Sequence, residues 1–393
     1  MKKLSLILLS IVVITSCKKS DTPTSTSTPS TPVTPSGGTF TNLFNFTSTT
    51  GQNPYGSLIL SGTILYGMTS AGGTNGLGNI FSIQTNGTGY TDLHDFAGGT
   101  ADGSGPSSDL IIIGSTLYGM TPQGGANGAG VIFSISTSGG AISILHAFGS
   151  TANDGVHPQG GLTVSGNTLY ATTPTGGANG LGNIFSFNLT GNVYTDLYDF
   201  NSGTTGMEPY CTLALANGVL YGTAYLGGGS ANDGTVFSYT ISSKIFTKLV
   251  TFTGTNGANP DGSVILSGTT LYGMTNAGGA NSLGNVYAVS TTGTGFTDSF
   301  DFTGINGSTP YGTFIINGST LYGMTTDGGT AAGGDVFSIS TGGTGFTNLV
   351  NFSTTASPGA FPHGSLVLSN NVLYGMTNAG GLNSFGTIFK YSL

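Results

Sequence analysis

The chain has 393 residues, of which 70 are glycine, 37% are hydrophobic and only 6% are charged. This composition excludes a disordered protein, because disorder requires few apolar residues and many charges. It favours many short strands joined by tight turns. Seven lysines and no arginine stand against 15 acidic residues, which gives a formal net charge of −8. We expect no nucleic-acid partner, because a phosphate backbone requires clustered cations.

The N-terminus has the pattern of an export signal. Two lysines precede an apolar stretch over residues 4–14, which is too short for a stable transmembrane helix. The tetrapeptide Ile-Thr-Ser-Cys that ends at Cys17 resembles the lipobox of bacterial lipoproteins. This resemblance implies that residues 1–16 are removed and that Cys17 carries a diacylglycerol. We therefore expect a lipid anchor in the bacterial cell envelope, at the outer membrane, the cell surface or the periplasmic side.

The segment after the cysteine is predicted to be a tether. Residues 20–38 consist almost entirely of Ser, Thr, Pro and Gly. Proline keeps such a segment extended, and the hydroxyl side chains keep it solvated. The predicted organisation is a signal peptide over residues 1–16, a lipidated tether over residues 17–38 and a repeat domain over residues 39–393.

A repeat of about 50 residues fills the remaining chain. Its clearest mark is Leu-Tyr-Gly-Met-Thr or a close variant, whose tyrosines are Tyr66, Tyr118, Tyr170, Tyr221, Tyr272, Tyr322 and Tyr374. Each repeat divides into four apolar segments separated by turn signals such as the Asn-Gly of residues 217–218. Four strands of about six residues and their turns have the size of one propeller blade.

The phase of the repeat predicts how the domain closes. It begins with a fourth-type segment at residues 41–46 and ends on a third-type segment at residues 388–393. The N-terminal strand can therefore complete the C-terminal blade and remove two exposed edges. We predict an all-β, seven-bladed propeller with four antiparallel strands per blade. A linear β-solenoid is the alternative fold, but it gives no reason to start out of phase.

The repeat also resembles a known family. Leu-Tyr-Gly-Met-Thr, the glycine pair at residues 72–73 and Gly-Asn-Ile-Phe at residues 78–81 are similar to the GloVer-type tandem repeat of exported bacterial proteins. That repeat has Leu-Tyr-Gly-Thr-Thr, a glycine pair and Gly-Thr-Val-Phe. The resemblance covers nearly all of residues 39–393 and implies a propeller fold and export. It implies no activity.

Most recurring or singular residues are interpreted as framework. The repeated tyrosines and the methionines beside them are predicted to pack between blades. His94 and His146 share a fourth-strand position that is apolar in the other repeats, which predicts packing. Asp196 and Asp199 have asparagine at the matching positions of other repeats, which favours hydrogen bonding or strand-end capping over acid-base chemistry. Cys211 is predicted to be a small buried thiol.

The candidate site comes from a position where the repeats differ. The residue after the proline that precedes each first strand varies in size and polarity, in the order Tyr55, Ser107, Gln159, Tyr210, Asp261, Tyr311 and His363. We predict that these residues surround the mouth of the central channel, with Asp102, Asp154 and Glu208 on adjoining loops. Tyr55, Gln159, Tyr210, Asp261, Tyr311 and His363 are the predicted ligand-binding residues. The alternative is drift at exposed loop positions.

The predicted function is non-catalytic binding of a glycan or a protein ligand. One alternative is an enzyme that degrades an extracellular polymer with carboxylates among Asp102, Asp154, Glu208 and Asp261. A structural surface protein or adhesin is the other alternative. No metal-ligand spacing, calcium loop or catalytic motif occurs in the sequence, so we expect no metal, no cofactor and no assigned catalytic residue. We expect a monomer.

Overall fold

The structure is a computed structural model that describes residues 37–354 and 358–393. The predicted leader, Cys17 and nearly all of the tether lie outside the described residues. Within the described residues every regular element is a β-strand. No helix that is long and apolar enough to cross a membrane occurs in this part of the chain.

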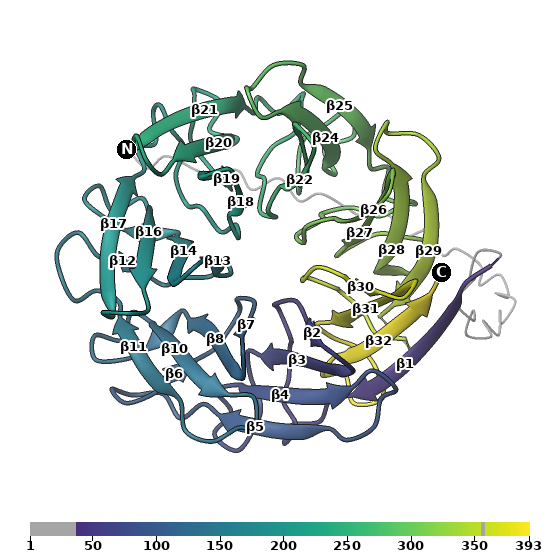
Figure 1. The fold of residues 1–393 in the computed structure, drawn as a ribbon. Helices are drawn as coiled ribbons and strands as arrows, with labels where there is room; N and C mark the ends of the chain where they lie inside the picture. The colour runs from purple at the N-terminus through teal and green to yellow at the C-terminus, as the bar shows by residue number, and fades with distance from the viewer. Residues whose placement is uncertain (1–36, 355–357) are drawn as a thin grey trace, which may run out of the picture. The chain divides into compact units, whose positions relative to one another are not determined.

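Seven four-stranded antiparallel sheets form a ring of blades (Figure 1). Blade 1 consists of β2 (Ile59–Ser61), β3 (Ile64–Thr69), β4 (Asn79–Gln84) and β5 (Thr91–Asp95), and blade 2 consists of β7 (Ile111–Ile113), β8 (Thr116–Thr121), β10 (Val131–Ser136) and β11 (Ser143–Ala147). Blade 3 consists of β13 (Thr163–Ser165), β14 (Thr168–Thr173), β16 (Asn183–Asn188) and β17 (Val193–Asp199), and blade 4 consists of β18 (Ala214–Ala216), β19 (Val219–Ala224), β20 (Thr235–Thr240) and β21 (Ile245–Thr251). Blade 5 consists of β22 (Ile265–Ser267), β23 (Thr270–Thr275), β24 (Asn285–Ser290) and β25 (Thr297–Asp301). Blade 6 consists of β26 (Ile315–Asn317), β27 (Thr320–Thr325), β28 (Ala332–Ser340) and β29 (Thr347–Ser353). Blade 7 consists of β30 (Val367–Ser369), β31 (Val372–Thr377), β32 (Thr387–Ser392) and β1 (Thr39–Asn45). The predicted seven-bladed propeller is confirmed, and the solenoid alternative is wrong.

The N-terminal strand closes the ring as predicted. Strand β1 pairs antiparallel with β32, and the register runs from Thr39 opposite Ser392 to Asn45 opposite Thr387. The side chain of Asn45 adds a contact, because its Oδ1 accepts a hydrogen bond of 3.0 Å from the backbone N–H of Leu382. The first strand in the sequence therefore completes the last blade, and no blade has an incomplete outer edge.

The inner strands are shorter than the sequence predicts. Strand β2 has three residues, as do its counterparts in the other blades. The residues just before these strands direct their backbone donors to the neighbouring blade instead of to their own sheet, as described below. Two short ribbons, β6 (Gly103–Ser104) with β9 (Gln123–Gly124) and β12 (Gly155–Val156) with β15 (Thr175–Gly176), were not predicted.

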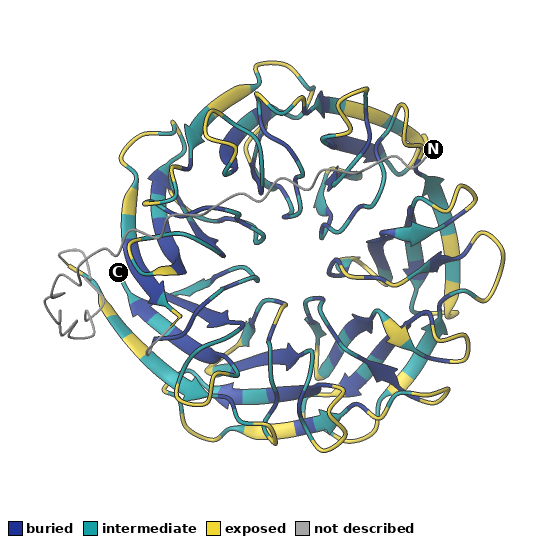
Figure 2. Cartoon of the chain, turned by 180° about the vertical axis from the view of Figure 1, so that it is seen from behind, coloured by how far each residue is buried: buried dark blue, intermediate teal, exposed yellow. Residues whose placement is uncertain are grey.

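The hydrophobic core lies between adjacent blades. One cluster joins Tyr66 and Met68 of blade 1 to Leu110, Leu117 and Phe133 of blade 2, and six similar clusters occur in the described residues. Buried residues lie mainly on the second and third strands of each blade, such as β3 and β4, whereas the innermost strands are partly buried and exposed residues lie on the outer strands and loops (Figure 2). The tyrosine and methionine of the repeat signature thus pack between blades, as predicted.

Candidate functional site

Glycines allow the inner segments of neighbouring blades to approach each other closely. A Cβ placed on Gly56 would lie 2.3 Å from the carbonyl oxygen of Ser108, and one on Gly312 would lie 2.4 Å from that of Gly364. Both distances are far shorter than a van der Waals contact, so a side chain at these positions would force the blades apart. This close packing sets the width of the central channel.

A ring of hydrogen bonds connects these segments from blade to blade. The residue three positions after each proline directs its backbone N–H at the side-chain oxygen of its counterpart in the next blade. We call these seven residues the inner belt: Ser57, Asp109, Gly161, Thr212, Ser263, Thr313 and Ser365. Six of the links are present, at donor–acceptor distances between 2.5 and 3.0 Å. The link that Asp109 would make is missing because Gly161 has no side chain.

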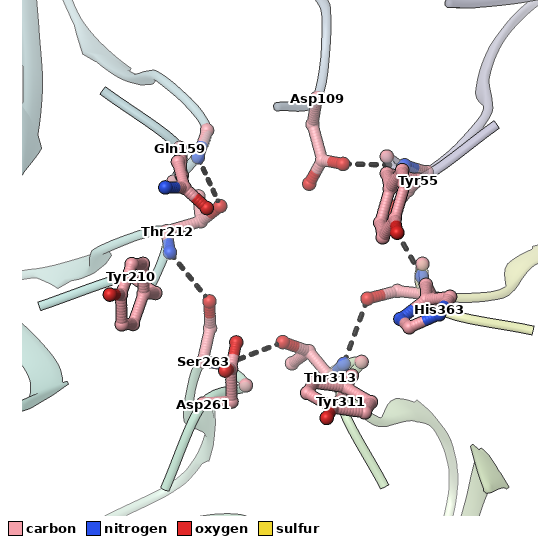
Figure 3. A pocket seen from close by; sticks show the side chains of 18 of the residues that line it. Tyr55, Asp109, Gln159, Tyr210, Thr212, Asp261, Ser263, Tyr311, Thr313 and His363 are labelled. Carbon is pink, nitrogen blue, oxygen red and sulfur yellow. Dashed lines mark hydrogen bonds between the residues drawn. The ribbon is translucent and has the colours of Figure 1, made fainter. Parts of the chain in front are cut away.

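The inner belt and the residues above it line one pocket at the channel mouth (Figure 3). Its cavity volume is about 310 Å³. All seven residues of the variable position line it: Tyr55, Ser107, Gln159, Tyr210, Asp261, Tyr311 and His363. Seven positions about 50 residues apart in the sequence therefore converge on one cavity, because each begins the innermost segment of its blade.

Three of the aromatic residues of the pocket lie side by side, and Tyr210 lies apart from them (Figure 3). The His363 ring lies 4.6 Å from the Tyr55 ring and 4.9 Å from the Tyr311 ring, with interplanar angles of 43° and 42°. These three residues come from blades 7, 1 and 6, so their sequence separation hides their contact. We call them the aromatic arc. Gln159 lies across the pocket from this arc, whereas Asp109 lies beside Tyr55 (Figure 3).

Burial shifts the protonation of the ionisable pocket residues. It raises the pKa of the Asp261 carboxyl to about 7 and lowers the pKa of the His363 imidazole to about 4. Burial also raises the pKa of Asp109, although hydrogen bonds from Ser57 oppose this effect. No lysine or arginine lines the pocket. At neutral pH the pocket therefore holds a neutral imidazole and two carboxyl groups, with no cation to neutralise them.

Glu208 supports the pocket from outside its lining. Its Oε2 accepts a hydrogen bond of 3.2 Å from the Tyr210 hydroxyl. The Tyr210 ring also packs edge-on against Tyr225, with 5.6 Å between the ring centroids. Burial and the nearby Glu208 charge raise the pKa of the Tyr210 phenol. These contacts orient the Tyr210 ring, and they make Glu208 a supporting residue of this site.

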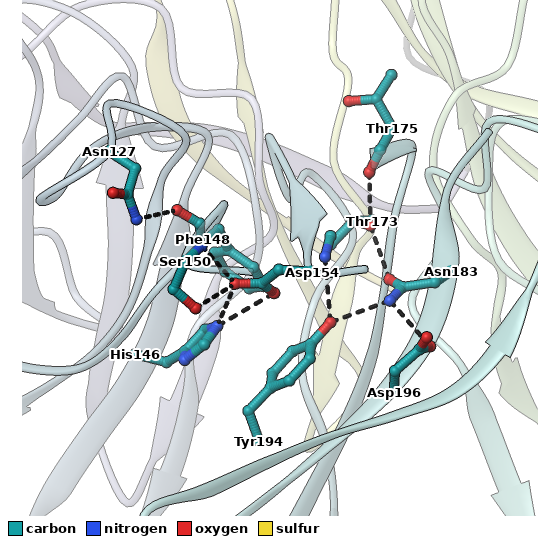
Figure 4. A network of polar contacts seen from close by, with 11 residues as sticks. Asn127, His146, Phe148, Ser150, Asp154, Thr173, Thr175, Asn183, Tyr194 and Asp196 are labelled. Atoms are coloured by element: carbon teal, nitrogen blue, oxygen red, sulfur yellow. Dashed lines mark hydrogen bonds and ion pairs between the residues drawn. The ribbon is translucent and has the colours of Figure 1, made fainter. Parts of the chain in front are cut away.

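Asp102 and Asp154 do not line the pocket, which corrects their predicted place beside the channel mouth. The Nε2 atoms of His94 and His146 lie 3.1 and 3.0 Å from carboxylate oxygens of Asp102 and Asp154, respectively. Figure 4 shows the second pair within a network of polar side chains. Each histidine on an outer strand is matched by an aspartate eight residues later, so the pair is part of the framework.

The His146 position combines packing with this polar contact. Its ring stacks on Tyr194 at 4.4 Å with an interplanar angle of 7°, as the predicted packing role requires. Burial alone would raise the pKa of the Asp154 carboxyl, but hydrogen bonds from His146 and Ser150 outweigh burial and hold the pKa below its usual range. The contact between His146 and Asp154 was not predicted from the sequence, because it joins two different positions of the repeat.

The substitution Asp154→Asn is expected to lower the free energy of unfolding by about 1–3 kcal/mol at neutral pH, because a buried network loses its charged acceptor. The pKa of Asp154 is lower in the folded than in the unfolded protein, so its stabilising effect is present at neutral pH and declines as the pH falls through the folded pKa. Urea unfolding at several pH values measures this difference. An equal difference between wild type and variant at pH 7 and pH 3 would contradict it.

The paired acidic residues of the outer strands cap loops, as predicted. Asp199 Oδ1 accepts a hydrogen bond of 2.7 Å from the Ala178 N–H, and Asp301 Oδ1 accepts one of 2.7 Å from the Ala280 N–H. Asn45 makes the corresponding contact in blade 7. Because an amide oxygen replaces the carboxylate there, the position requires only an acceptor and no ionisable group.

Cys211 is a buried thiol without a disulfide partner in the described residues. Its Sγ lies 3.3 Å from the carbonyl oxygen of Thr223, and burial raises the thiol pKa to about 11. A thiol of this kind is a poor nucleophile at neutral pH, so the residue packs as predicted. In the described residues, no group of three or more His, Cys, Asp or Glu side chains is arranged to hold a metal ion.

Asp109 is the pocket residue that sequence analysis missed. A signal for it was present, because the position three residues after each proline carries Ser or Thr in five of the seven repeats and Asp or Gly in the other two. This position lies two residues beyond the variable one and differs much less among the repeats. Only the ring of backbone donors shows why the hydroxyl recurs.

Comparison with known proteins places this chain in a family. The model of the Gloeobacter/Verrucomicrobia repeat matches residues 31–232 and 225–393. The chain therefore belongs to the Gloeobacter/Verrucomicrobia repeat family, as the sequence resemblance predicts. No curated protein matches the sequence.

Two solved structures that resemble this chain at low sequence identity differ in how closely they match, and the one with a TM-score above 0.5 shares the fold. One is described as the extracellular domain of a one component system from B. thetaiotaomicron, with a TM-score of 0.56, 10% identity, and coverage of 89% of this chain and 39% of that chain. This chain thus spans about two fifths of the length of that relative. TolB from Acinetobacter baumannii has a TM-score of 0.41, 10% identity, and coverage of 85% of this chain and 78% of that chain.

Proposed function

We propose that this protein is an exported, non-catalytic binding module whose ligand enters the central pocket. One observation carries the proposal: seven positions that vary among otherwise similar repeats converge on a single cavity of about 310 Å³. The inner belt that supports them carries Ser or Thr in five of the seven repeats. An inner belt of similar residues beneath a ring of variable residues is the arrangement expected of a recognition site.

The chemistry of the rim suits a sugar. The aromatic arc of Tyr55, His363 and Tyr311 offers ring faces to the apolar face of a pyranose. Gln159 across the pocket and Asp109 beside Tyr55 can form hydrogen bonds with hydroxyl groups. A glycan is therefore the preferred ligand over a protein surface, because the cavity holds a ring-sized group and the rim combines aromatic faces with few polar groups.

The carboxylates favour binding over polymer hydrolysis. Asp102 and Asp154 are bonded to histidines outside the pocket, and Glu208 is outside its lining. Asp261 is the only one of the four predicted acids in the lining. A glycosidase needs two carboxyl groups on either side of one bond. The second carboxyl group of the lining is that of Asp109, which accepts the backbone N–H of Ser57 within the inner belt, and the other three acids proposed for this role lie outside the lining.

The proposed location is the cell exterior or envelope, with the lipid anchor at Cys17. The leader and tether in the sequence support it, and the propeller from B. thetaiotaomicron is described as an extracellular domain. Retention of the wild type in a detergent-soluble membrane fraction, and its release into the soluble fraction after Cys17→Ala, would test the anchor. Equal distribution of the two forms would contradict it.

The binding proposal predicts that the combined variant Tyr55→Ala, Tyr210→Ala and Tyr311→Ala loses at least about tenfold in affinity for a glycan identified on an array, because stacking surfaces are removed. Isothermal titration calorimetry measures the loss. A matched control changes three exposed apolar residues away from the pocket, Val193, Ile245 and Leu382, to alanine. Unchanged affinity in the tyrosine variant, or an equal loss in the control, would overturn the site.

A further inference from the structure

Asp261 is the carboxylate of the pocket lining that the protein leaves without a hydrogen-bond donor among the described residues. Asp109, by comparison, accepts the backbone N–H of Ser57. Asp261 is partly buried, and a carboxylate that is partly withdrawn from water without a partner costs free energy. The framework does not use Asp261, so a ligand is the reasonable source of its partner.

Two aromatic rings flank this carboxylate. Figure 3 shows Asp261 between Tyr210 and Tyr311 at the edge of the pocket. The Asp261 charge raises the pKa of both phenols, although burial contributes more in each case. Tyr210 is held in place by Glu208 and Tyr225, and Tyr311 by His363. A free carboxylate between two positioned aromatic rings has the composition of sites that bind organic cations.

We propose that Asp261, Tyr210 and Tyr311 form a subsite for an ammonium group, and that the ligand is a glycan with a free amino sugar. The inference deepens the proposed function and rests on it. The ammonium group forms the ion pair with Asp261 and contacts the two ring faces, while the sugar ring extends toward the aromatic arc. No lysine or arginine in the lining competes for the carboxylate.

A metal ion fits this subsite less well than an ammonium group. Calcium and magnesium take six or more oxygen ligands, and the subsite offers one carboxylate and two phenols that stay protonated. Aromatic faces attract a cation through the ring quadrupole without direct ligation. The one carboxylate and two aromatic rings therefore favour an organic ammonium group over a metal ion.

The proposal is tested with three β-1,4-linked trisaccharides that differ only at C2: chitosan trisaccharide with amino groups, chitin trisaccharide with acetamido groups and cellotriose with hydroxyl groups. Calorimetric titration of the repeat domain should show binding of chitosan trisaccharide at least about tenfold tighter than that of the other two, because an ion pair and cation–π contacts are added. The substitution Asp261→Asn should remove this preference.

The matched control is Asp298→Asn on the outer strand β25 of the same blade. It changes the net charge equally, and asparagine occupies the matching position at Asn42 and Asn348. This control separates the subsite from general attraction between a cationic sugar and an acidic protein. Loss of the chitosan preference in Asp261→Asn, with retention in Asp298→Asn, supports the ammonium subsite. Equal loss in both variants overturns it.

The pH dependence gives an independent readout. The Asp261 charge acts on the pKa values of Tyr210, Tyr311 and Cys211. Glu208 acts on Tyr210, Asp327 and Tyr55 act on Tyr311, and Tyr225 acts on both tyrosines. Burial holds the Tyr210, Tyr311 and Cys211 groups protonated at neutral pH and raises the pKa of Asp261 to about 7. The affinity for lysine amide, an ammonium probe whose side-chain amine stays protonated between pH 5 and pH 7, should therefore rise about tenfold over this range as Asp261 ionises. An affinity independent of pH in this range would contradict the ion pair.

The outcomes distinguish the inference from the proposed function. Equal binding of the three trisaccharides, with Asp261→Asn unchanged, overturns the ammonium subsite and leaves the glycan pocket standing. Absence of binding for all three, with no glycan found on an array, overturns the proposed function. Lysine amide, an ammonium without a sugar, is the last probe. If it binds as tightly as chitosan trisaccharide and depends on Asp261, the subsite is supported and the sugar ligand is overturned.

Discussion

The substitution Asp335→Asn is expected to raise the free energy of unfolding by about 1–3 kcal/mol at neutral pH. Asp335 lies in β28, the third strand of blade 6, and is fully buried. Neither carboxylate oxygen has a hydrogen-bond partner among the described residues. Burial raises the pKa of the carboxyl group to about 7, against a smaller lowering effect of the Asn348 side chain. The ionised Asp335 carboxylate therefore destabilises the folded protein.

Other blades show why asparagine suits this position. In blade 5 the Asn285 Oδ1 accepts a hydrogen bond of 2.7 Å from the Thr275 hydroxyl, and its Nδ2 donates one of 3.2 Å to the carbonyl oxygen of Asn256. Asn79 makes the same pair of contacts in blade 1. An amide can accept at one end and donate at the other, whereas an ionised carboxylate can only accept.

The pH dependence follows from the direction of the shift. The pKa of Asp335 is higher in the folded protein, at about 7, than in an unfolded chain, where it is about 3.9. The folded state then binds the proton more tightly, so stability is greatest below the unfolded pKa and declines as the pH rises from about 4 to 7. The variant lacks this decline. Urea unfolding between pH 4 and pH 8 measures the difference.

The reciprocal substitution provides the control. Asn285→Asp places a carboxyl group at the matching position of blade 5, and it should destabilise the protein and add a similar decline with pH. If Asp335→Asn lowers stability at pH 7, or if wild type and variant show the same pH dependence, the carboxyl group has a partner and the explanation is wrong.

Removal of strand β1 is expected to destabilise the whole propeller, because this strand belongs to blade 7 and packs against blades 6 and 1. It completes the sheet of blade 7 through β32. The Phe40 ring lies 5.6 Å from Phe389 and 6.3 Å from Phe352 of blade 6, and the Phe44 ring stacks at 4.3 Å on Tyr90 of blade 1. Loss of one strand therefore exposes the β32 edge and weakens the contacts with both neighbouring blades.

A chain that begins at Phe46 should lose at least about 5 kcal/mol relative to one that begins at Gly37, which is a large part of the stability of an ordinary domain. Melting temperatures and light scattering measure the loss and any association through the free edge. Transfer of Thr39–Asn45 to the C-terminus, after Leu393 and a connector copied from residues 85–90, should restore stability. Equal melting temperatures for the two starting points would contradict closure by β1.

The repeat made the architecture predictable from sequence. The recurrence of the Leu-Tyr-Gly segment set the number of blades, and the offset between residues 41–46 and residues 388–393 predicted the closure. Both follow from local pattern, because each blade is one supersecondary unit whose strands are sequence neighbours. The same logic identified the variable position after each proline, since equivalent positions of a cyclic repeat must lie around the same axis.

Contacts between blades were not predictable in the same way. The pairing of His146 with Asp154, the backbone donors of the inner belt and the position of Asp109 depend on which side chains face each other across loops and between repeats. A repeat alignment compares each position with its copies, whereas these interactions join different positions.

The sequence by itself determined that this protein is a seven-bladed propeller and which seven residues lie around its channel mouth, because both depend on periodicity. The tertiary structure decided which of those residues act together. It placed Asp261 between Tyr210 and Tyr311 and moved Asp102 and Asp154 out of the pocket. The physical reason is that distance across the ring depends on blade packing and side-chain direction, which no single repeat contains.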